Sequence, residues 1–283
     1  MVYTSDAMNF QMRQTFDMIL ILFMILMTIY VPKVVGMCPR GCLCDDFKLT
    51  TICGSESHLN FVPHTLNPAL KELVLYDNHI KGIKSSLSVY RDLNKLDISR
   101  NQLSSLGEYN FLDNSKIETI VFNTNLLTSI DNNTFNGLTS LKRMDLSDNK
   151  LEELNPNGFR PLTSLQILDL SENRIRYISV EAFDGLQELI ELNLRSNKLN
   201  TIPSNSLGFV PNLQVLDLGS NSLINVSNDA FLPLSSLSDL YLDNCSLSSL
   251  EDHCFRGLNR LSILRLTNNQ LKACLVFING LII

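Results

Sequence analysis

Apolar residues recur along most of this chain in a fixed frame, L-x-x-L-x-L-x-x-N-x-L, in which L stands for leucine or another aliphatic residue. The L-x-L alternation places apolar side chains on one face of an extended segment and variable side chains on the other, which is the period-two pattern of a β-strand. The frame begins nine times, 23 or 24 residues apart, at Leu70, Leu93, Ile117, Leu141, Leu165, Leu189, Leu213, Leu237 and Leu261. We therefore predict one strand per repeat, stacked in register into a parallel sheet.

The ninth position of the frame is polar in nearly every repeat. It is occupied by Asn78, Asn101, Asn125, Asn149, Asn173, Asn197, Asn221 and Asn269, and by Cys245 in the eighth repeat. A side-chain amide both donates and accepts hydrogen bonds, so it can satisfy backbone groups of its own coil and of the neighbouring coil where the chain turns. This pattern predicts a ladder of asparagines that closes each turn.

A second ladder is aromatic and lies on the return path of each repeat. It consists of Phe111, Phe135, Phe159, Phe183, Phe231 and Phe255, with Leu207 in the sixth repeat. Each aromatic ring buries about 150 to 250 Å², so the back of every coil should be wider than its strand side. The predicted fold is an α/β-type solenoid of nine repeats over residues 70–271. It should form a horseshoe with a concave parallel β-sheet and an irregular or 3-10 convex side.

Residues 1–36 have the layout of a secretory signal peptide. Arg13 precedes an apolar stretch over residues 18–31, and the small residues Val34 and Gly36 stand at the minus-three and minus-one positions of a plausible cleavage site. The stretch is 14 residues long, which is short for a bilayer span of about 20. We predict cleavage and a secreted or extracellular location, with a retained signal anchor as the alternative.

Four cysteines follow the proposed cleavage site. They are Cys38, Cys42, Cys44 and Cys53, in the pattern C-x-x-x-C-x-C followed by a fourth cysteine after eight residues. A zinc site is an alternative, but the C-x-C spacing and the secretory context favour disulfides. The spacing alone leaves all three pairings open.

The frame matches the leucine-rich-repeat signature, and the segment 37–69 resembles the N-terminal cap of extracellular leucine-rich-repeat proteins. The cysteine block is followed by Leu59, Val62, Pro63 and Leu66, as in slit-type ligands, small matrix proteoglycans, chondroadherin and neuronal receptors. The resemblance covers residues 38 to about 271. It implies that Cys38 pairs with Cys44 and that Cys42 pairs with Cys53.

The pattern decays in the apolar tail over residues 272–283. Cys274 still occupies a core position, but Asn279 stands where an aromatic is expected. Family members usually continue with an N-P-W-x-C-x-C motif, and this chain has no tryptophan. We expect a chain truncated at its C-terminus. A makeshift cap formed by the tail and an end-to-end partner are the alternatives.

Charge and motifs narrow the functional classes. The formal net charge is −6, and no run of lysine or arginine supports nucleic-acid binding. The four histidines are scattered, and no catalytic, phosphate-binding or dinucleotide-binding motif occurs. We predict no enzyme activity, no cofactor, no metal and no small-molecule substrate.

Three cysteines lie outside the cap. Cys245, Cys254 and Cys274 each fit a small buried position, with a Cys245–Cys254 bridge as an alternative. Acceptor sequons for N-glycosylation occur at Asn132, Asn225 and Asn244. Asn244 is the least favoured of the three, because Cys245 beside it is expected to be buried.

A ligand is expected on the variable strand positions that line the concave face. Two groups are candidates: an acidic column that includes Asp145, Asp169 and Asp217, and an apolar group formed by Ile167, Val215, Tyr241 and Ile263. The acidic column would suit a basic ligand, but L-D-L-S-x-N is also simply common in such repeats. The predicted function is extracellular protein binding, as an adhesion protein, a ligand or a receptor ectodomain. A matrix component and a fragment of a transmembrane innate-immune or neuronal receptor are the alternatives, with membrane attachment only if the natural C-terminus is longer.

Overall fold

A computed structural model of the chain describes residues 36–84 and 86–271, together with the backbone of residues 277–278 and 281–282. Residues 1–35 of the predicted signal peptide lie outside the described residues, as do Cys274 and Asn279. The described part from Gly36 onward forms one compact unit.

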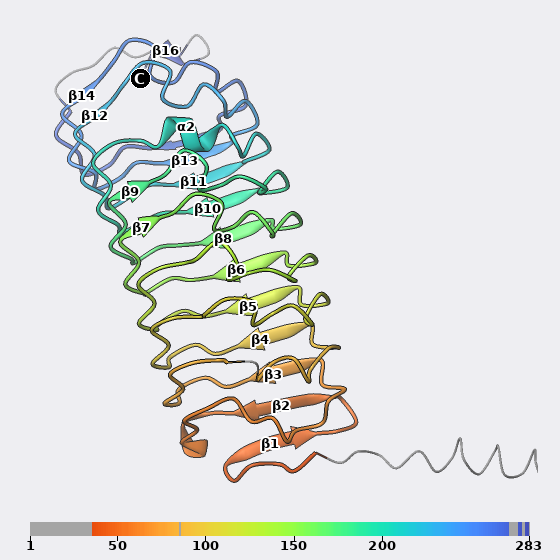
Figure 1. Ribbon diagram of the computed structural model, residues 1–283. Coiled ribbons are helices and arrows are strands. Elements are labelled where there is room, and N and C mark those ends of the chain that lie inside the picture. The colour runs from red at the N-terminus through yellow and green to blue at the C-terminus, as the bar shows by residue number, and fades with distance from the viewer. Residues whose placement is uncertain (1–35, 85, 272–276, 279–280, 283) are drawn as a thin grey trace, which may run out of the picture. The chain divides into compact units, whose positions relative to one another are not determined.

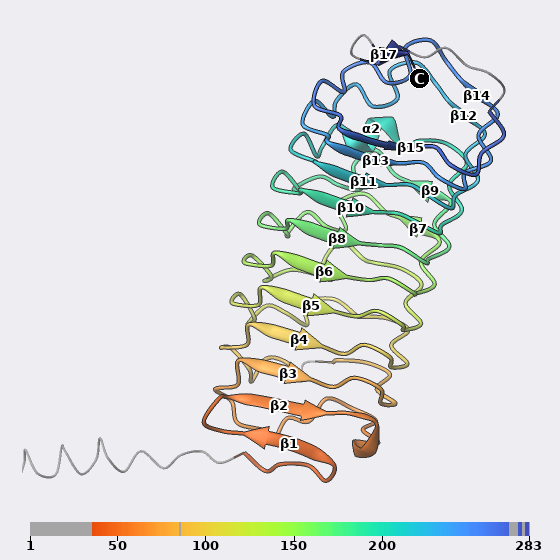
Figure 2. The same ribbon diagram turned by 180° about the vertical axis from the view of Figure 1, so that it is seen from behind.

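One strand per repeat forms a continuous sheet along one side of the stack (Figures 1 and 2). The repeat strands are β3 (Glu72–Val74), β4 (Lys95–Asp97), β5 (Thr119–Val121), β6 (Arg143–Asp145), β8 (Ile167–Asp169), β10 (Glu191–Asn193), β11 (Val215–Asp217), β13 (Asp239–Tyr241) and β15 (Ile263–Arg265). Each pairs in parallel with the next, as in Leu73 with Leu96 and Leu96 with Ile120. With β1 (Cys42–Asp45) and β2 (Thr50–Cys53) the sheet has 11 strands. The predicted leucine-rich-repeat horseshoe is confirmed.

The interior is filled by the two apolar sets that the repeat pattern predicts. Strand leucines such as Leu96 and Leu168 are fully buried, and so are Phe111, Phe135 and Phe183 on the return path. Rings from successive coils stack, with centroids 5.8 Å apart for Phe135 and Phe159. Phe231 and Phe255 stack in the same way, with centroids 6.1 Å apart, and the buried side chains form one core cluster along the coils.

The asparagine ladder closes each turn between coils. Nδ2 of Asn149 donates to the carbonyls of Phe122, Leu146 and Ser147, each at 3.1 Å, and its Oδ1 accepts the Leu127 N–H at 3.0 Å. The residue before the ladder position has a positive φ in every repeat, as at Asp148 with φ 50°. This left-handed geometry costs a non-glycine residue about 1 kcal/mol or more. The amide network of the ladder holds the chain in it.

Cys245 occupies the ladder position of the eighth repeat with fewer bonds. Its Sγ lies 3.2 Å from the Leu218 carbonyl oxygen and 3.5 Å from that of Asp243. A thiol has no oxygen to accept the backbone N–H that Oδ1 binds at the other rungs. The turn of the eighth repeat is therefore closed by fewer and weaker side-chain hydrogen bonds than the turns of the other repeats.

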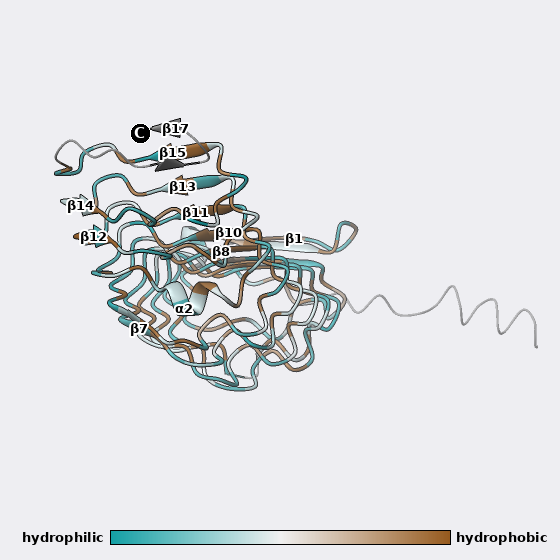
Figure 3. Ribbon diagram, turned by 90° about the horizontal axis from the view of Figure 1, so that it is seen from above, coloured by the Kyte–Doolittle hydropathy of each residue, from teal (hydrophilic) through white to brown (hydrophobic). Residues whose placement is uncertain are grey.

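The side opposite the sheet consists mostly of turns, as Figure 3 shows along the stack. Within the described repeats the only helix is the short α2 (Ser204–Leu207), and the 3-10 helix η1 (Ser55–Ser57) lies in the cap. Two small parallel ribbons also run along the flank: β7 (Glu153–Leu154) with β9 (Tyr177–Ile178), and β12 (Asn225–Val226) with β14 (Ser249–Leu250). These ribbons were not predicted, because two-residue strands carry no distinct pattern.

The two ends of the stack differ. In the cap, disulfides join Cys38 to Cys44 and Cys42 to Cys53, which is the pairing that the resemblance implies. Strand β2 pairs with β3, and the Tyr90 hydroxyl donates to the Pro63 carbonyl. Burial raises the pKa of Tyr90 to about 12. The core leucines of the first repeat, Leu70, Leu73 and Leu75, are accordingly buried.

At the other end, the core side chains of the ninth repeat remain partly buried. These are Leu261, Leu264, Leu266 and Leu271. In the tail, the backbone of β16 (Phe277–Ile278) pairs antiparallel with β17 (Leu281–Ile282). The ninth coil therefore retains apolar surface that the corresponding leucines of the first repeat do not expose.

Candidate functional site

The concave face displays two rows of variable side chains that cross the strands. The first row, from β8 to β15, reads Ile167, Glu191, Val215, Asp239 and Ile263, each directly paired with the next. These side chains are partly buried or, at Ile263, 41% exposed. We call this set the apolar–acidic row. In this register, each apolar residue of the row is separated from the next by a carboxylate.

The second row lies beside the first on the same strands. It reads Asp169, Asn193, Asp217, Tyr241 and Arg265. The Arg265 guanidinium lies 5.1 Å from the centroid of the Tyr241 ring, which is a cation–π contact. Tyr241 thus lies in the second row, on the strand between those of Val215 and Ile263.

The aspartates of the predicted acidic column are engaged with their own backbone. Oδ1 of Asp145 accepts the N–H of Ser147 at 2.9 Å and its hydroxyl at 2.6 Å. Asp169 binds Ser171 in the same way, at 2.8 and 2.6 Å, and Asp217 accepts the Gly219 N–H at 2.8 Å. Each carboxylate closes the bend that follows its strand. The aspartates of the L-D-L-S-x-N motif therefore have a structural role in closing the bend, which explains their recurrence without a basic ligand.

An ion-pair cluster, which we call the clasp, joins three coils at the edge of the face. Nη2 of Arg195 in the sixth repeat lies 2.7 Å from Oδ2 of Asp243 in the eighth, and Nη1 lies 3.5 Å from Asp217 in the seventh. The arginine passes over Gly219, where an added Cβ would stand 2.4 Å from Nη1. The absence of a side chain at Gly219 is what lets one arginine reach across a whole coil.

The clasp changes the acidity of its members. Hydrogen bonding to Arg195 holds the pKa of Asp243 below its usual range, and the same bond raises the pKa of Arg195 further. Burial raises the pKa of Asp217, although Arg195 opposes the shift. Sequence reasoning missed the clasp, because its residues lie 22 to 48 positions apart. A signal was present in the sequence: the seventh position of the frame is Arg195, Gly219 and Asp243 in three successive repeats.

The two carboxylates of the apolar–acidic row are Glu191 on β10 and Asp239 on β13. Within the residues that the structure describes, neither Glu191 nor Asp239 forms an ion pair. At the opposite end of the same column, Glu72 is bound by Lys95 at 2.8 Å. Asp239 accepts only the hydroxyl of its neighbour Ser238 among the hydrogen bonds of its described surroundings. These two charges are therefore available to a ligand.

All three predicted glycosylation acceptors are exposed. Asn132 lies in a turn, Asn225 begins β12 on the flank, and Asn244 lies in the bend after β13. Nδ2 of Asn244 donates to Asp243 at 3.0 Å. Asn244 is exposed although Cys245 beside it is buried as expected, and glycosylation at the three sites stays a prediction.

The two described cysteines outside the cap lie in the interior. Cys245 and Cys254 are both buried, and no disulfide joins them, so the bridge considered from the sequence is not formed. Burial raises the pKa of the Cys245 thiol. Its Sγ is enclosed at the ladder position, against the carbonyls of Leu218 and Asp243.

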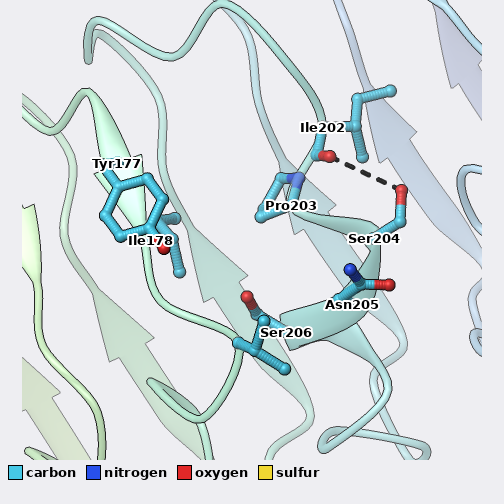
Figure 4. Close-up of a pocket in the computed structure, with 8 residues that line it drawn as sticks. Tyr177, Ile178, Ile202, Pro203, Ser204, Asn205 and Ser206 are labelled. Atoms are coloured by element: carbon cyan, nitrogen blue, oxygen red, sulfur yellow. Dashed lines mark hydrogen bonds between the residues drawn. The ribbon is translucent and has the colours of Figure 1, made fainter.

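A pocket of about 360 Å³ opens on the flank where the ribbons are interrupted. In the regular ribbon, the Ser179 N–H donates to the Leu154 carbonyl at 3.0 Å. Pro203 takes the equivalent position in the sixth repeat and has no N–H to donate. Figure 4 shows Tyr177 and Ile178 on one side of the opening and Pro203 and α2 on the other. The pocket is thus a break between β9 and β12, open to solvent.

Two searches of the described residues were negative. In that part of the chain no group of three or more metal-ligating side chains is close enough to hold an ion. The helices seen there are also too short and too polar to cross a bilayer.

Comparison with known proteins identifies the repeat. The family described as Leucine rich repeat matches residues 91–151, 115–175, 164–223 and 211–271. Leucine-rich repeat-containing protein 3B of Homo sapiens is 29% identical over 107 residues, 36% of this chain and 40% of that protein. Oligodendrocyte-myelin glycoprotein of Homo sapiens is 33% identical over 93 residues, 33% of this chain and 20% of that protein.

The fold comparison agrees with the sequence comparison. The protein in a structure titled "Crystal structure of TLR13-ssRNA13 complex" superposes with a TM-score of 0.69 and 33% identity, covering 74% of this chain and 30% of that one. Each match thus spans less than half the length of the relative. The family matches together run without a gap over residues 91–271, more than half of the sequence. The chain belongs to the leucine-rich-repeat family.

Proposed function

We propose that this protein is an extracellular protein-binding module whose concave face, over strands β8 to β15, holds a protein ligand. Leucine-rich-repeat domains are typically protein-interaction modules, which sets the class of function. The observation that carries the proposal is the apolar–acidic row, in which accessible aliphatic side chains alternate with carboxylates that have no ion-pair partner among the described residues. Protein interfaces combine apolar contacts with charged groups placed to complement those of the partner.

The extracellular location is proposed on three grounds. Two disulfides in the cap require an oxidising compartment to form and persist. The acceptors Asn132, Asn225 and Asn244 are exposed, so a glycosylating enzyme can reach them. The layout of residues 1–36 is that of a secretory signal. An adhesion protein, a secreted ligand and a receptor ectodomain all satisfy these conditions.

A protein partner is favoured over a nucleic acid by charge. Between β8 and β13 the two rows contain four carboxylates and no lysine or arginine. Nucleic-acid affinity depends mainly on cationic contacts to phosphates, and the chain carries a formal net charge of −6. The RNA named for the TLR13 structure is therefore not proposed as a ligand here.

The test compares variants of the concave face with variants of the flank. The double variant Tyr241→Asp/Ile263→Asp and the control Tyr177→Asp/Ile224→Asp, at exposed flank positions, would be screened with the wild type against a panel of recombinant ectodomains. Binding of at least one partner should be lost in the concave variant and kept in the control. Equal binding by both variants, or loss only in the control, would contradict the proposal. Circular dichroism would establish that both variants fold.

A further inference from the structure

We infer that the element bound by this face is a basic amphipathic α-helix lying across the strands, with apolar residues seven positions apart and lysine or arginine between them. The inference rests on the proposed function, since it specifies the ligand of the same face. It follows from the order and spacing of the apolar–acidic row, whose members come from five consecutive strands of the sheet.

The spacing of the row matches a helix and does not match an extended strand. Neighbouring strands of a sheet lie about 4.8 Å apart, so Ile167, Val215 and Ile263 follow one another at about 9.6 Å. A helix rises about 1.5 Å per residue, which places residues i and i+7 about 10.5 Å apart on nearly the same side. Over the whole row the mismatch is about 2 Å, which flexible side chains can absorb. An extended segment presents same-side residues about 6.8 Å apart and loses register after one step.

The carboxylates of the row stand where such a helix would present its charges. Glu191 and Asp239 each lie one strand, about 4.8 Å, from the apolar residues on either side. On a helix, the residues three and four positions from an apolar anchor lie about 5 to 6 Å from it. Lysine or arginine at those positions would meet Glu191 and Asp239, which have no ion-pair partner of their own in the described structure.

The surroundings limit where the basic residues can be. Arg143 on β6 precedes the row, and Arg265 on β15 stands at its far end. Both would repel further cations on the ligand. Of the two second-row carboxylates on these strands, Asp217 is bound by Arg195, and Asp169 accepts hydrogen bonds from Ser171 and Asn193. The basic part of the ligand should therefore span only the stretch between β8 and β13, about two to three helical turns.

A synthetic probe tests this directly on the full chain. The probe is a side-chain-stapled helical peptide of about 18 residues with leucine at i, i+7 and i+14, lysine at the intervening i+3, i+4, i+10 and i+11, and glutamine or alanine elsewhere. Three controls share its composition or its pattern: a scrambled helix, an unstapled peptide interrupted by proline, and a helix with glutamate in place of lysine. Fluorescence anisotropy would measure each affinity. The lysine helix should bind with a micromolar Kd, at least tenfold more tightly than every control.

Charge reversal provides the second arm. Glu191→Lys/Asp239→Lys should weaken the lysine helix at least tenfold and bring the glutamate helix to comparable affinity. The control Glu153→Lys/Asp252→Lys makes the same change of charge at exposed positions away from the row and should change neither Kd by more than twofold. Such a swap of specificity cannot come from a general effect on folding or net charge.

The outcomes separate this inference from the proposed function. If the proline-interrupted peptide binds as tightly as the helix, the ligand is an extended segment and the inference is overturned. If none of the peptides binds while the ectodomain screen still depends on Tyr241 and Ile263, the concave face is the binding surface but its ligand is not this helix. If Glu153→Lys/Asp252→Lys weakens the lysine helix and Glu191→Lys/Asp239→Lys does not, the apolar–acidic row is not the binding site of the helix.

Discussion

The second to fifth repeats and the sixth to eighth repeats share one frame but differ in how strictly they follow it. The earlier group has an asparagine at every ladder position and a phenylalanine in every return path. The later group contains Leu207 in the aromatic ladder, Pro203 in the flank ribbon, Gly219 beneath the clasp and Cys245 in the asparagine ladder. These departures occur in the coils that carry most of the apolar–acidic row. The difference indicates that regular coils supply stability, whereas irregular coils tolerate features that serve the surface.

The largest expected effect is on the free energy of unfolding, and it distinguishes a ladder position occupied by asparagine from the one occupied by Cys245. Asn149→Ala should lower the free energy of unfolding by about 3 to 4 kcal/mol, because it leaves several buried backbone groups unsatisfied at about 1 to 3 kcal/mol each. Cys245→Ala should cost only about 1 kcal/mol, because a thiol is a weak donor and accepts no backbone N–H in this position. Urea denaturation followed by circular dichroism measures both.

The matched control for this pair is Asn200→Ala, which removes an exposed asparagine of the sixth repeat. It should change the stability by no more than about 0.5 kcal/mol. Equal losses for Asn149→Ala and Cys245→Ala would mean that the thiol closes its turn as well as the amide does, and the comparison between the two groups of repeats would fail at this point.

The clasp should have an intermediate effect that depends on pH. Arg195→Ala should cost about 1 kcal/mol near pH 7, since its side chain is 35% exposed and solvent weakens the pair. Because Arg195 lowers the pKa of Asp243, this contribution is fully present above the ordinary aspartate value of 3.8 and is lost as the pH falls through the lowered pKa. The raised pKa of Asp217 acts in the opposite direction and reduces the effect.

Thermal unfolding at pH 7 and at pH 3 measures this dependence, with Lys198→Ala as the control at an exposed position. The gap between wild type and Arg195→Ala should narrow at the lower pH, whereas the control should show no gap at either. Gly219→Ala should reproduce part of the loss, because its Cβ would occupy the path of the guanidinium. A gap that widened in acid would contradict the assigned role of Asp243.

The smallest effect concerns the break in the flank ribbon. Pro203→Thr restores an N–H opposite the Ile178 carbonyl and should join β9 to β12 through the sixth repeat. The gain in stability should be below about 1 kcal/mol, because one new hydrogen bond is partly offset by the greater freedom of the unfolded chain. Hydrogen exchange should show slower exchange around residues 201–203. Unchanged exchange there would mean that the sixth coil departs from the ribbon for a reason other than its proline.

Much of the fold could be predicted because each repeat imposes the same demand. An L-x-L strand with one buried face, a ladder amide and a return-path aromatic can be satisfied only by stacking identical coils. Leu96, Asn149 and Phe135 accordingly lie where the frame places them. The candidate site was predicted less well. Ile167, Val215 and Ile263 were placed on the correct face, but the carboxylates between them and the clasp beside them were not singled out.

The sequence by itself determined the architecture of this protein, since a period of 23 or 24 residues converts local patterning into a global stack. It also determined which side chains face outward from the sheet, because alternation along a strand depends on neighbouring residues alone. Only the tertiary structure decided which outward side chains became neighbours, which carboxylates were left without ion-pair partners, and how Arg195 reached Asp243. Those relations depend on register between coils, and register is a property of the packed stack rather than of any single repeat.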